Sequence, residues 1–149
     1  MTLDEAIRRL RTLDEPVPKP PRLPTAEEVA QAERDLGVTF HPDYRRFQLE
    51  ASNVALGDLE PGLVLPGIEH PSLRDIVRDA KALGVPVSLL PFCEDNGDYF
   101  VMDSAGRVGL WDHQQRKASP AYDSLATWIV KEWISRADDG DGDEDDDED

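Results

Sequence analysis

The sequence predicts an α+β fold in a single domain, with a mainly antiparallel central sheet flanked by helices. Three observations support this prediction: the 149 residues fit one domain, helical periodicity dominates the first half of the chain, and strand patterns dominate the second half. Separate runs of helix and of antiparallel strand are typical of α+β folds. We divide the chain into an N-terminal helix with a proline-rich linker (1–23), an α+β domain (24–136) and an acidic tail (137–149).

Four helices are predicted from apolar residues at spacings of three and four, most of them with a capping residue or a proline at the start. They are expected over residues 3–13, 26–36, 42–51 and 72–83. A proline-rich stretch, 16–24, follows the first helix. Because proline cannot continue a helix, we expect this stretch to run extended as a spacer.

Strand patterns surround and follow the fourth helix. Strands are expected over residues 63–65, 87–92, 98–103, 107–112 and 116–118. The third and fourth of these flank a short turn that contains Gly106, so they predict an antiparallel hairpin. A last helix is expected to begin between Ser119 and Ser124 and to end near Arg136.

The net charge limits the classes of partner. The chain carries 16 Lys and Arg against 32 Asp and Glu, a formal charge of −16, and ten of the acidic residues lie between Asp138 and Asp149. The tail is predicted to be disordered, because it has no apolar residue after Ala137. An acidic chain is repelled by nucleic-acid phosphates and anionic membranes, and it attracts basic proteins. We therefore expect a basic protein partner, with neither nucleic acid nor membrane bound.

Composition excludes further classes of protein. Cys93 is the only cysteine, so the chain has no internal disulfide and no cysteine zinc cluster. No apolar run reaches the roughly 18 residues of a membrane-spanning helix. The N-terminal segment lacks the apolar core of a signal peptide. We expect a cytoplasmic monomer without a cofactor.

The densest polar group is the segment 94–98, Glu-Asp-Asn-Gly-Asp. It lacks the alternating ligands and final glutamate of a calcium loop, and its Asn-Gly pair favours a turn between strands. Cys93 precedes two carboxylates, which disfavour a thiolate nucleophile. Asp112 and His113 are adjacent and are expected to point apart on a strand. We expect no enzyme and no bound metal, and the alternative of a different class is a small metal-dependent enzyme built on 94–98.

Four segments in order resemble the SUKH superfamily (the Smi/Knr family). The segment 41–47 is similar to its proline–x–x–aromatic–x–x–Phe helix start, and 91–103 to its Pro-Phe, acidic loop, Gly-Asp and aromatic strand. The segment 108–113 resembles the strand that follows, and 124–128 the closing helix. The resemblance covers about residues 24–135. The chain departs from the family pattern at Asn53-Val54, where Asn-Gly is usual, at His41, where leucine is common, and in 55–71, which matches no family segment.

The resemblance implies an α+β domain with a central sheet flanked by helices. For most bacterial members it implies an immunity protein of a polymorphic toxin system, which binds a cognate toxin and blocks it without catalysis. Such toxins are often nucleases or other enzymes that act on nucleic acid. The fungal relatives act as cell-wall and signalling regulators, so a regulatory scaffold is the alternative function.

A surface that binds a basic toxin is expected to combine exposed carboxylates with an aromatic anchor. We predict that the contact surface is bordered by Asp58, Glu60, Glu94, Asp95, Asp98, Asp112 and His113, with Tyr99 or Trp111 as the anchor. Both aromatics also fit a core position. The acidic tail is predicted to steer a basic partner over long range, and the alternatives are mimicry of nucleic acid in the toxin's active site or disorder without a role.

Overall fold

The computed structural model describes residues 1–65 and 71–139, and within them it confirms the predicted α+β architecture. In chain order the elements are α1 (Leu3–Leu13), α2 (Ala26–Leu36), α3 (Pro42–Ala51), α4 (Leu73–Leu83), β1 (Leu90–Asp95), β2 (Asp98–Met102), β3 (Val108–Asp112), β4 (Lys117–Tyr122), α5 (Leu125–Trp128) and a π-helical segment, η1 (Ile129–Ile134). Residues 135–139 continue η1 as α-helix. Residues 137–139, which we predicted to begin the disordered tail, are therefore helical, and the rest of the predicted tail, 140–149, lies outside the described ranges. No helix in those ranges is both long and apolar enough to cross a membrane.

Local capping sets the helix boundaries that the sequence predicted. Thr25 caps α2, and Glu28 returns the bond to complete the capping box. At the other end Gly37 adopts the left-handed conformation, with φ +67°, and ends the helix. Proline at the first turn starts α3, where His41 Nδ1 accepts the backbone N–H of Asp43 at 3.1 Å.

The sheet is fully antiparallel in the order β1-β2-β3-β4, so each strand is joined to its neighbour by a hairpin. The β1–β2 turn contains Asn96 and Gly97, whose φ angles are +54° and +96°. Two consecutive residues with positive φ are the geometry that an Asn-Gly hairpin favours. This turn confirms the prediction that 94–98 connects two strands.

Three predicted strands were placed or sized incorrectly. β1 begins at Leu90 and not at Val87, because Pro86 starts a turn. In this turn the N–H of Leu89 donates to the carbonyl of Pro86 at 3.1 Å. β4 extends through Ser119-Pro120, which we had considered as a helix start. Proline is tolerated there because β4 is an edge strand. The predicted strand at 63–65 is reduced to one isolated bridge from Leu63 to Ser72.

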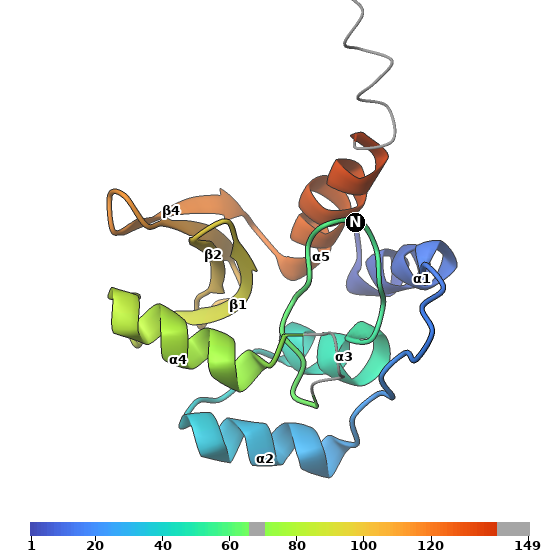
Figure 1. Cartoon of the computed structure of the whole chain (residues 1–149), viewed down its shortest axis with the longest axis horizontal. Coiled ribbons are helices and arrows are strands. Elements are labelled where there is room, and N and C mark those ends of the chain that lie inside the picture. The colour runs from blue at the N-terminus through green and yellow to red at the C-terminus, as the bar shows by residue number, and fades with distance from the viewer. Residues whose placement is uncertain (66–70, 140–149) are drawn as a thin grey trace, which may run out of the picture.

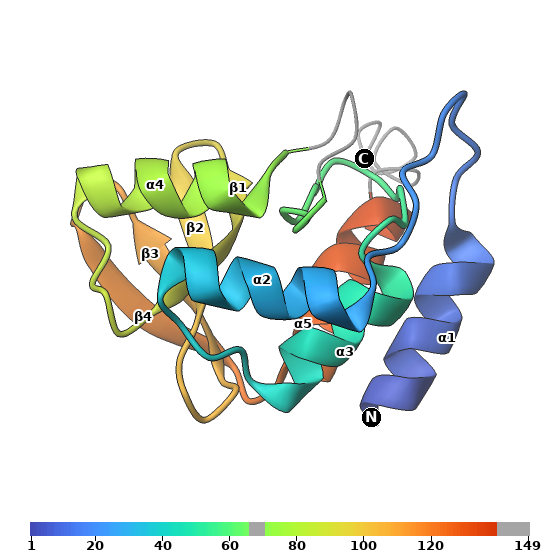
Figure 2. The same cartoon turned by 90° about the horizontal axis from the view of Figure 1, so that it is seen from below.

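The two faces of the sheet pack against different helices. Figure 1 shows α4 on one side of the sheet and α5 on the other. The α5 side holds the large core, which includes Phe92, Phe100 and Met102, and the α4 side holds a small core around Tyr99 and Trp111. Figure 2 shows α1 at the far end of the molecule from the sheet. Residues of α1 nevertheless belong to the large core, so α1 packs with the rest of the domain.

Buried hydrogen bonds fix the loop between α3 and α4 beside the sheet. The amide nitrogen of Gln48, which is fully buried, donates to the carbonyl of Gly62 at 2.9 Å, and its oxygen accepts from Val64 at 3.3 Å. The indole of Trp133 donates to the carbonyl of Leu56 at 2.8 Å. The N–H of Gly62 then bonds the carbonyl of Phe92 in β1 at 2.8 Å. This loop carries two of the predicted contact residues to the edge of β1.

Candidate functional site

Two turns are joined at one end of the sheet. Asp98 Oδ1, on the β1–β2 turn, accepts the backbone N–H of His113 at 3.0 Å and lies 2.6 Å from its ring Nδ1. These two bonds from His113 hold the pKa of the Asp98 carboxyl below its ordinary value, with the backbone N–H as the main cause. The imidazole lies over Gly97, where an added Cβ would be 3.2 Å from Nδ1. The β1–β2 and β3–β4 turns therefore form one rigid unit.

Asp112 belongs to the same unit. Its Oδ1 accepts the backbone N–H groups of Gln114 at 2.7 Å and Gln115 at 3.1 Å, so it closes the β3–β4 turn. Side-chain ligand atoms of Asp98, Asp112 and His113 all lie within 4.8 Å of one another. We had expected Asp112 and His113 to point apart, but β3 ends at Asp112 and His113 turns back toward Asp98. Each carboxylate in the trio already uses an oxygen for turn hydrogen bonds.

Glu94 and Asp95 lie on opposite faces of the sheet. Glu94 is opposite Tyr99 in the ladder and lines a groove with α4, and its Oε2 also accepts the N–H of Gly97 at 2.7 Å. Asp95 pairs with Arg136 of the C-terminal helix at 3.2 Å. The period of two along a strand separates these neighbours, so the acidic segment serves two surfaces.

Asp58 and Glu60 reach this region on the loop beside β1. Asp58 is exposed and lines a shallow cavity with Arg136 and Ala137. Glu60 is also exposed, and its backbone lies against the thiol of Cys93. Cys93 is fully buried. Burial and then the charge of Asp95 raise the pKa of the Cys93 thiol above its ordinary value, which disfavours a thiolate nucleophile.

The two predicted aromatic anchors occupy different positions. Trp111 is 1% exposed and belongs to the small core, so it offers almost no surface to a partner. Tyr99 is 5% exposed, and it lines the groove that Glu94 forms with α4. The two rings contact each other with centroids 6.2 Å apart. Trp111 therefore supports Tyr99 from beneath.

The sequence prediction missed Asp75 and Asp79 of α4. Both line the same groove as Glu94 and Tyr99. Their spacing of four residues places them on one helix face, a signal that the sequence contains. Their position next to the hairpin depends on how α4 packs over the sheet, which spacing alone does not give.

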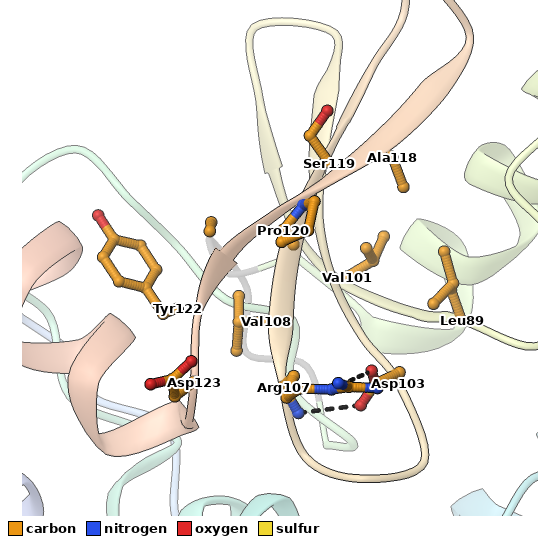
Figure 3. Close-up of a pocket in the computed structure, with 12 residues that line it drawn as sticks. Leu89, Val101, Asp103, Arg107, Val108, Ala118, Ser119, Pro120, Tyr122 and Asp123 are labelled. Atoms are coloured by element: carbon orange, nitrogen blue, oxygen red, sulfur yellow. Dashed lines mark hydrogen bonds and ion pairs between the residues drawn. The ribbon is translucent and has the colours of Figure 1, made fainter.

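A second cavity, of about 390 Å³, opens at the other end of the sheet. Figure 3 shows its apolar lining, which includes Leu89, Val101 and Pro120. At its rim Arg107 Nε bonds the carboxylate of Asp103 at 2.9 Å. None of the predicted contact residues lies here.

Fold and site together define a small α+β domain with a group of carboxylates at one end of its sheet. The family model SUKH_5, described as SMI1-KNR4 cell-wall, matches residues 3–134, so the chain belongs to this family. The chain is also similar to a protein of known crystal structure from Pseudomonas syringae pv. tomato, with 32% identity and a TM-score of 0.82, over 89% of this chain and 98% of that one. No curated protein matches. The predicted resemblance is confirmed, and the family match includes α1.

Proposed function

We propose that the chain is a non-enzymatic immunity protein, which binds a cognate basic toxin through one acidic surface and neutralises it. Its family includes immunity proteins. The observation that carries the proposal is the number of carboxylates that neighbouring elements bring to one end of the sheet, on both of its faces. We call this surface the acidic edge; its members are Asp58, Glu60, Asp75, Asp79, Glu94, Asp95, Asp98 and Asp112.

The acidic edge keeps a net negative charge although four basic residues border it: Arg78, Arg116, Lys117 and Arg136. The two best-placed arginines are already engaged, since Arg136 pairs with Asp95 and Arg78 bonds carboxylates of α4. Complementary charge accelerates the encounter of two proteins and suppresses wrong partners. Steered association reaches about 10⁸–10⁹ M⁻¹s⁻¹ at low salt, which suits an inhibitor that must act before damage accumulates.

The polar groups of the acidic edge support binding better than catalysis. Glu94, Asp98 and Asp112 each accept backbone N–H groups that hold turns. A general base or nucleophile needs a free group within reach of a substrate pocket. Fixed carboxylates on rigid turns instead give a preorganised surface, which lowers the entropy lost when a protein partner binds.

The first test is capture of a partner from the native host, at low and at moderate salt, with the chain as bait. The toxic domain of any large protein recovered is then expressed alone in a surrogate bacterium, where it should arrest growth. Co-expression of the chain should restore growth. Recovery of several housekeeping proteins instead would favour a regulatory scaffold, and stoichiometric metal in the purified chain would favour a metal-dependent enzyme.

The acidic edge is tested by the double charge reversal Asp95→Lys and Asp98→Lys. We expect it to abolish both capture and growth rescue. The matched control reverses two exposed charges away from the sheet, Glu27→Lys on α2 and Glu50→Lys on α3, and should retain both activities. Unchanged toxin binding by the first double variant would remove the acidic edge as the contact surface.

The acidic tail is a further part of the proposal. Residues beyond Asp139 lie outside the described ranges, so its role is tested by truncation. If the tail steers the toxin, its loss should slow association and reduce the salt dependence while inhibition remains. If the tail mimics nucleic acid, its loss should abolish inhibition.

A further inference from the structure

The cavity at the end of the sheet opposite the acidic edge has a volume of about 390 Å³ and a mainly apolar lining (Figure 3). Strand positions often carry β-branched or aromatic side chains, but Gly109, Ala118 and Ala121 are small and leave this cavity open. A Cβ added at Gly109 would lie 2.7 Å from the carbonyl oxygen of Ser119, so a larger residue does not fit there. We call this cavity the apolar recess; its lining includes Leu89, Val101, Val108, Gly109, Ala118 and Pro120.

The segment that leads into β1 presents an apolar side chain next to the recess. Val87 is 79% exposed, the highest fraction among the large hydrophobic residues in the described ranges. It lies at the tip of the turn that the hydrogen bond from Leu89 to Pro86 closes. Turn tips usually carry Gly, Pro, Asn, Asp or Ser, so a valine there is unusual. A smaller cavity lined by Val87 shares Leu89 and Asp103 with the apolar recess, so the protruding valine and the recess belong to one surface.

Two opposite charges line the recess and have hydrogen-bonding capacity left. Arg107 bonds Asp103 through Nε at 2.9 Å, and within residues 1–65 and 71–139 its two terminal nitrogens form no hydrogen bond. Asp103 also accepts the backbone N–H of Arg107 at 3.0 Å, which orients the arginine. Asp123 is exposed and forms no ion pair in the same ranges. An oriented cation and a carboxylate therefore accompany the apolar lining.

The charge distribution of the chain favours this end for contact between two copies. Each copy carries a formal charge of −16, so two copies repel one another over long range. The acidic edge includes Asp95 and Asp112, which lie where β1 and β3 end, whereas the recess lies where β1 begins and β4 ends. Two copies that meet through their recesses therefore keep their acidic edges apart, which minimises the repulsion between them.

We propose that the apolar recess receives Val87 of a second copy of this chain, in a dimer with two-fold symmetry. Two-fold symmetry makes the contact reciprocal, so each copy contributes both the protruding valine and the recess. The same symmetry allows Arg107 of each copy to pair with Asp123 of the other. An apolar centre with a polar rim is the usual anatomy of a protein interface. The proposal differs from the monomer that the sequence led us to expect, and it goes beyond the proposed function because it does not involve the toxin.

Sedimentation velocity of the full-length chain over a range of concentrations, at low and at moderate salt, tests the dimer. We expect a reversible dimer whose fraction rises with concentration. Salt screens the repulsion between two chains of charge −16, so association should strengthen from low to moderate salt, whereas capture of a basic toxin should weaken. A sedimentation coefficient that stays that of a monomer at every concentration and salt would overturn the inference.

The protruding valine is tested by a substitution that leaves the charge unchanged. Val87→Ser should weaken dimerisation about tenfold, because it removes the apolar side chain that enters the recess. The matched control is Leu13→Ser, which changes another exposed apolar residue, at the end of α1, and should leave dimerisation unchanged. Equal dimerisation by the two variants would overturn the inference.

A pair of charge reversals tests the reciprocal ion pairs. Arg107→Glu alone places two carboxylates opposite each other at each contact, and Asp123→Arg alone places two arginines there. Either variant by itself should therefore dimerise about tenfold more weakly. An equimolar mixture of the two variants should form heterodimers as readily as the unaltered chain dimerises, because each contact then joins a carboxylate to an arginine. Such recovery would also show that both variants are folded, and its absence would contradict the two-fold arrangement.

Toxin capture separates this inference from the proposed function. Val87→Ser should lose the dimer but keep toxin capture and growth rescue, because the acidic edge is unchanged. If Val87→Ser loses toxin capture while the unaltered chain sediments as a monomer, the recess belongs to the toxin interface and the dimer is refuted. If the dimer forms as expected but no captured protein is neutralised, the dimer stands and the immunity function fails.

Discussion

The two faces of the sheet are covered to different degrees, and the proposed function assigns stability to one face and recognition to the other. On the α5 side, aromatic rings interlock: Phe92 lies with its ring centroid 5.0 Å from that of Trp128, and Phe100 lies 5.4 Å from the same indole. On the other side the small core underlies a single helix, α4, and a cavity opens at each end of the sheet. One face is closed by packing, and the other leaves polar and apolar surface open in the two cavities. Changes to the first face should therefore unfold the domain, and changes to the second should alter the turns and the groove.

The largest expected effect is on the closed face. Phe92→Ala removes a fully buried ring that contacts both Tyr44 and Trp128, so it should lower the free energy of unfolding by about 4 kcal/mol. Urea denaturation measures this loss. The matched variant Val101→Ala on the α4 face should cost clearly less, because it removes fewer atoms beside an open cavity. Equal losses at the two positions would contradict the comparison.

The next largest loss of stability is expected in the loop between α3 and α4. Gln48→Leu removes the buried amide that bonds Gly62 and Val64, which leaves a carbonyl and an N–H unpaired. Each unsatisfied buried group costs about 1–3 kcal/mol, so we expect a loss of about 3 kcal/mol. Hydrogen exchange at the amide of Val64 should accelerate more than exchange in β2. Slow exchange at Val64 in the variant would show that the loop does not depend on Gln48.

A smaller effect is expected at the joined turns. Gly97→Ala places a Cβ 3.2 Å from His113 Nδ1 at a φ of +96°. Gly37→Ala is the control, because its φ is +67° but nothing lies within 4 Å of the added Cβ. Both variants should lose about 1 kcal/mol of folding stability, because alanine is disfavoured in the left-handed conformation. Only Gly97→Ala should also displace the His113 ring signals in NMR spectra, and identical spectra there would argue against contact between the turns.

The smallest effect is a pH dependence. Because the bonds from His113 lower the pKa of Asp98 in the folded chain, this carboxylate contributes stability above the ordinary pKa of aspartate, near 3.9, and loses it as the pH falls through its lower folded pKa. Asp98→Asn should therefore reduce stability at neutral pH and flatten the decline below about pH 4. Thermal denaturation of both chains from pH 2.5 to 7 measures this pH dependence of stability. A parallel shift of the whole curve would indicate that Asp98 acts without a change of protonation.

Much of the fold could be predicted because local chemistry determines it. Thr25 with Glu28, and Asn96 with Gly97, specify a helix start and a turn from a few adjacent residues. The continuation of β4 through Pro120 could not be predicted, because it depends on that strand lying at the edge of the sheet.

The sequence indicated the carboxylates of the candidate site on the hairpins and on the loop beside β1, but not those on α4. The strand period of two already separates Glu94 from Asp95, and grouping both as one loop overlooked it. Asp75 and Asp79 join the surface only through the packing of α4, which is a tertiary fact. The sequence alone could not show whether Trp111 is a surface anchor or a core residue, because tryptophan occurs in both positions.

Pro120 has a consequence for how another chain can approach. The outer edge of β4 carries a residue without an N–H, opposite Gly109 in the ladder. At the other edge, the N–H of Gly62 occupies the carbonyl of Phe92 in β1. Strand addition, the route by which many proteins recruit peptides and by which exposed sheets polymerise, is thereby obstructed at both margins. Under the proposed function, specificity for the toxin would therefore be encoded in side chains, where single substitutions can change it without disturbing the sheet.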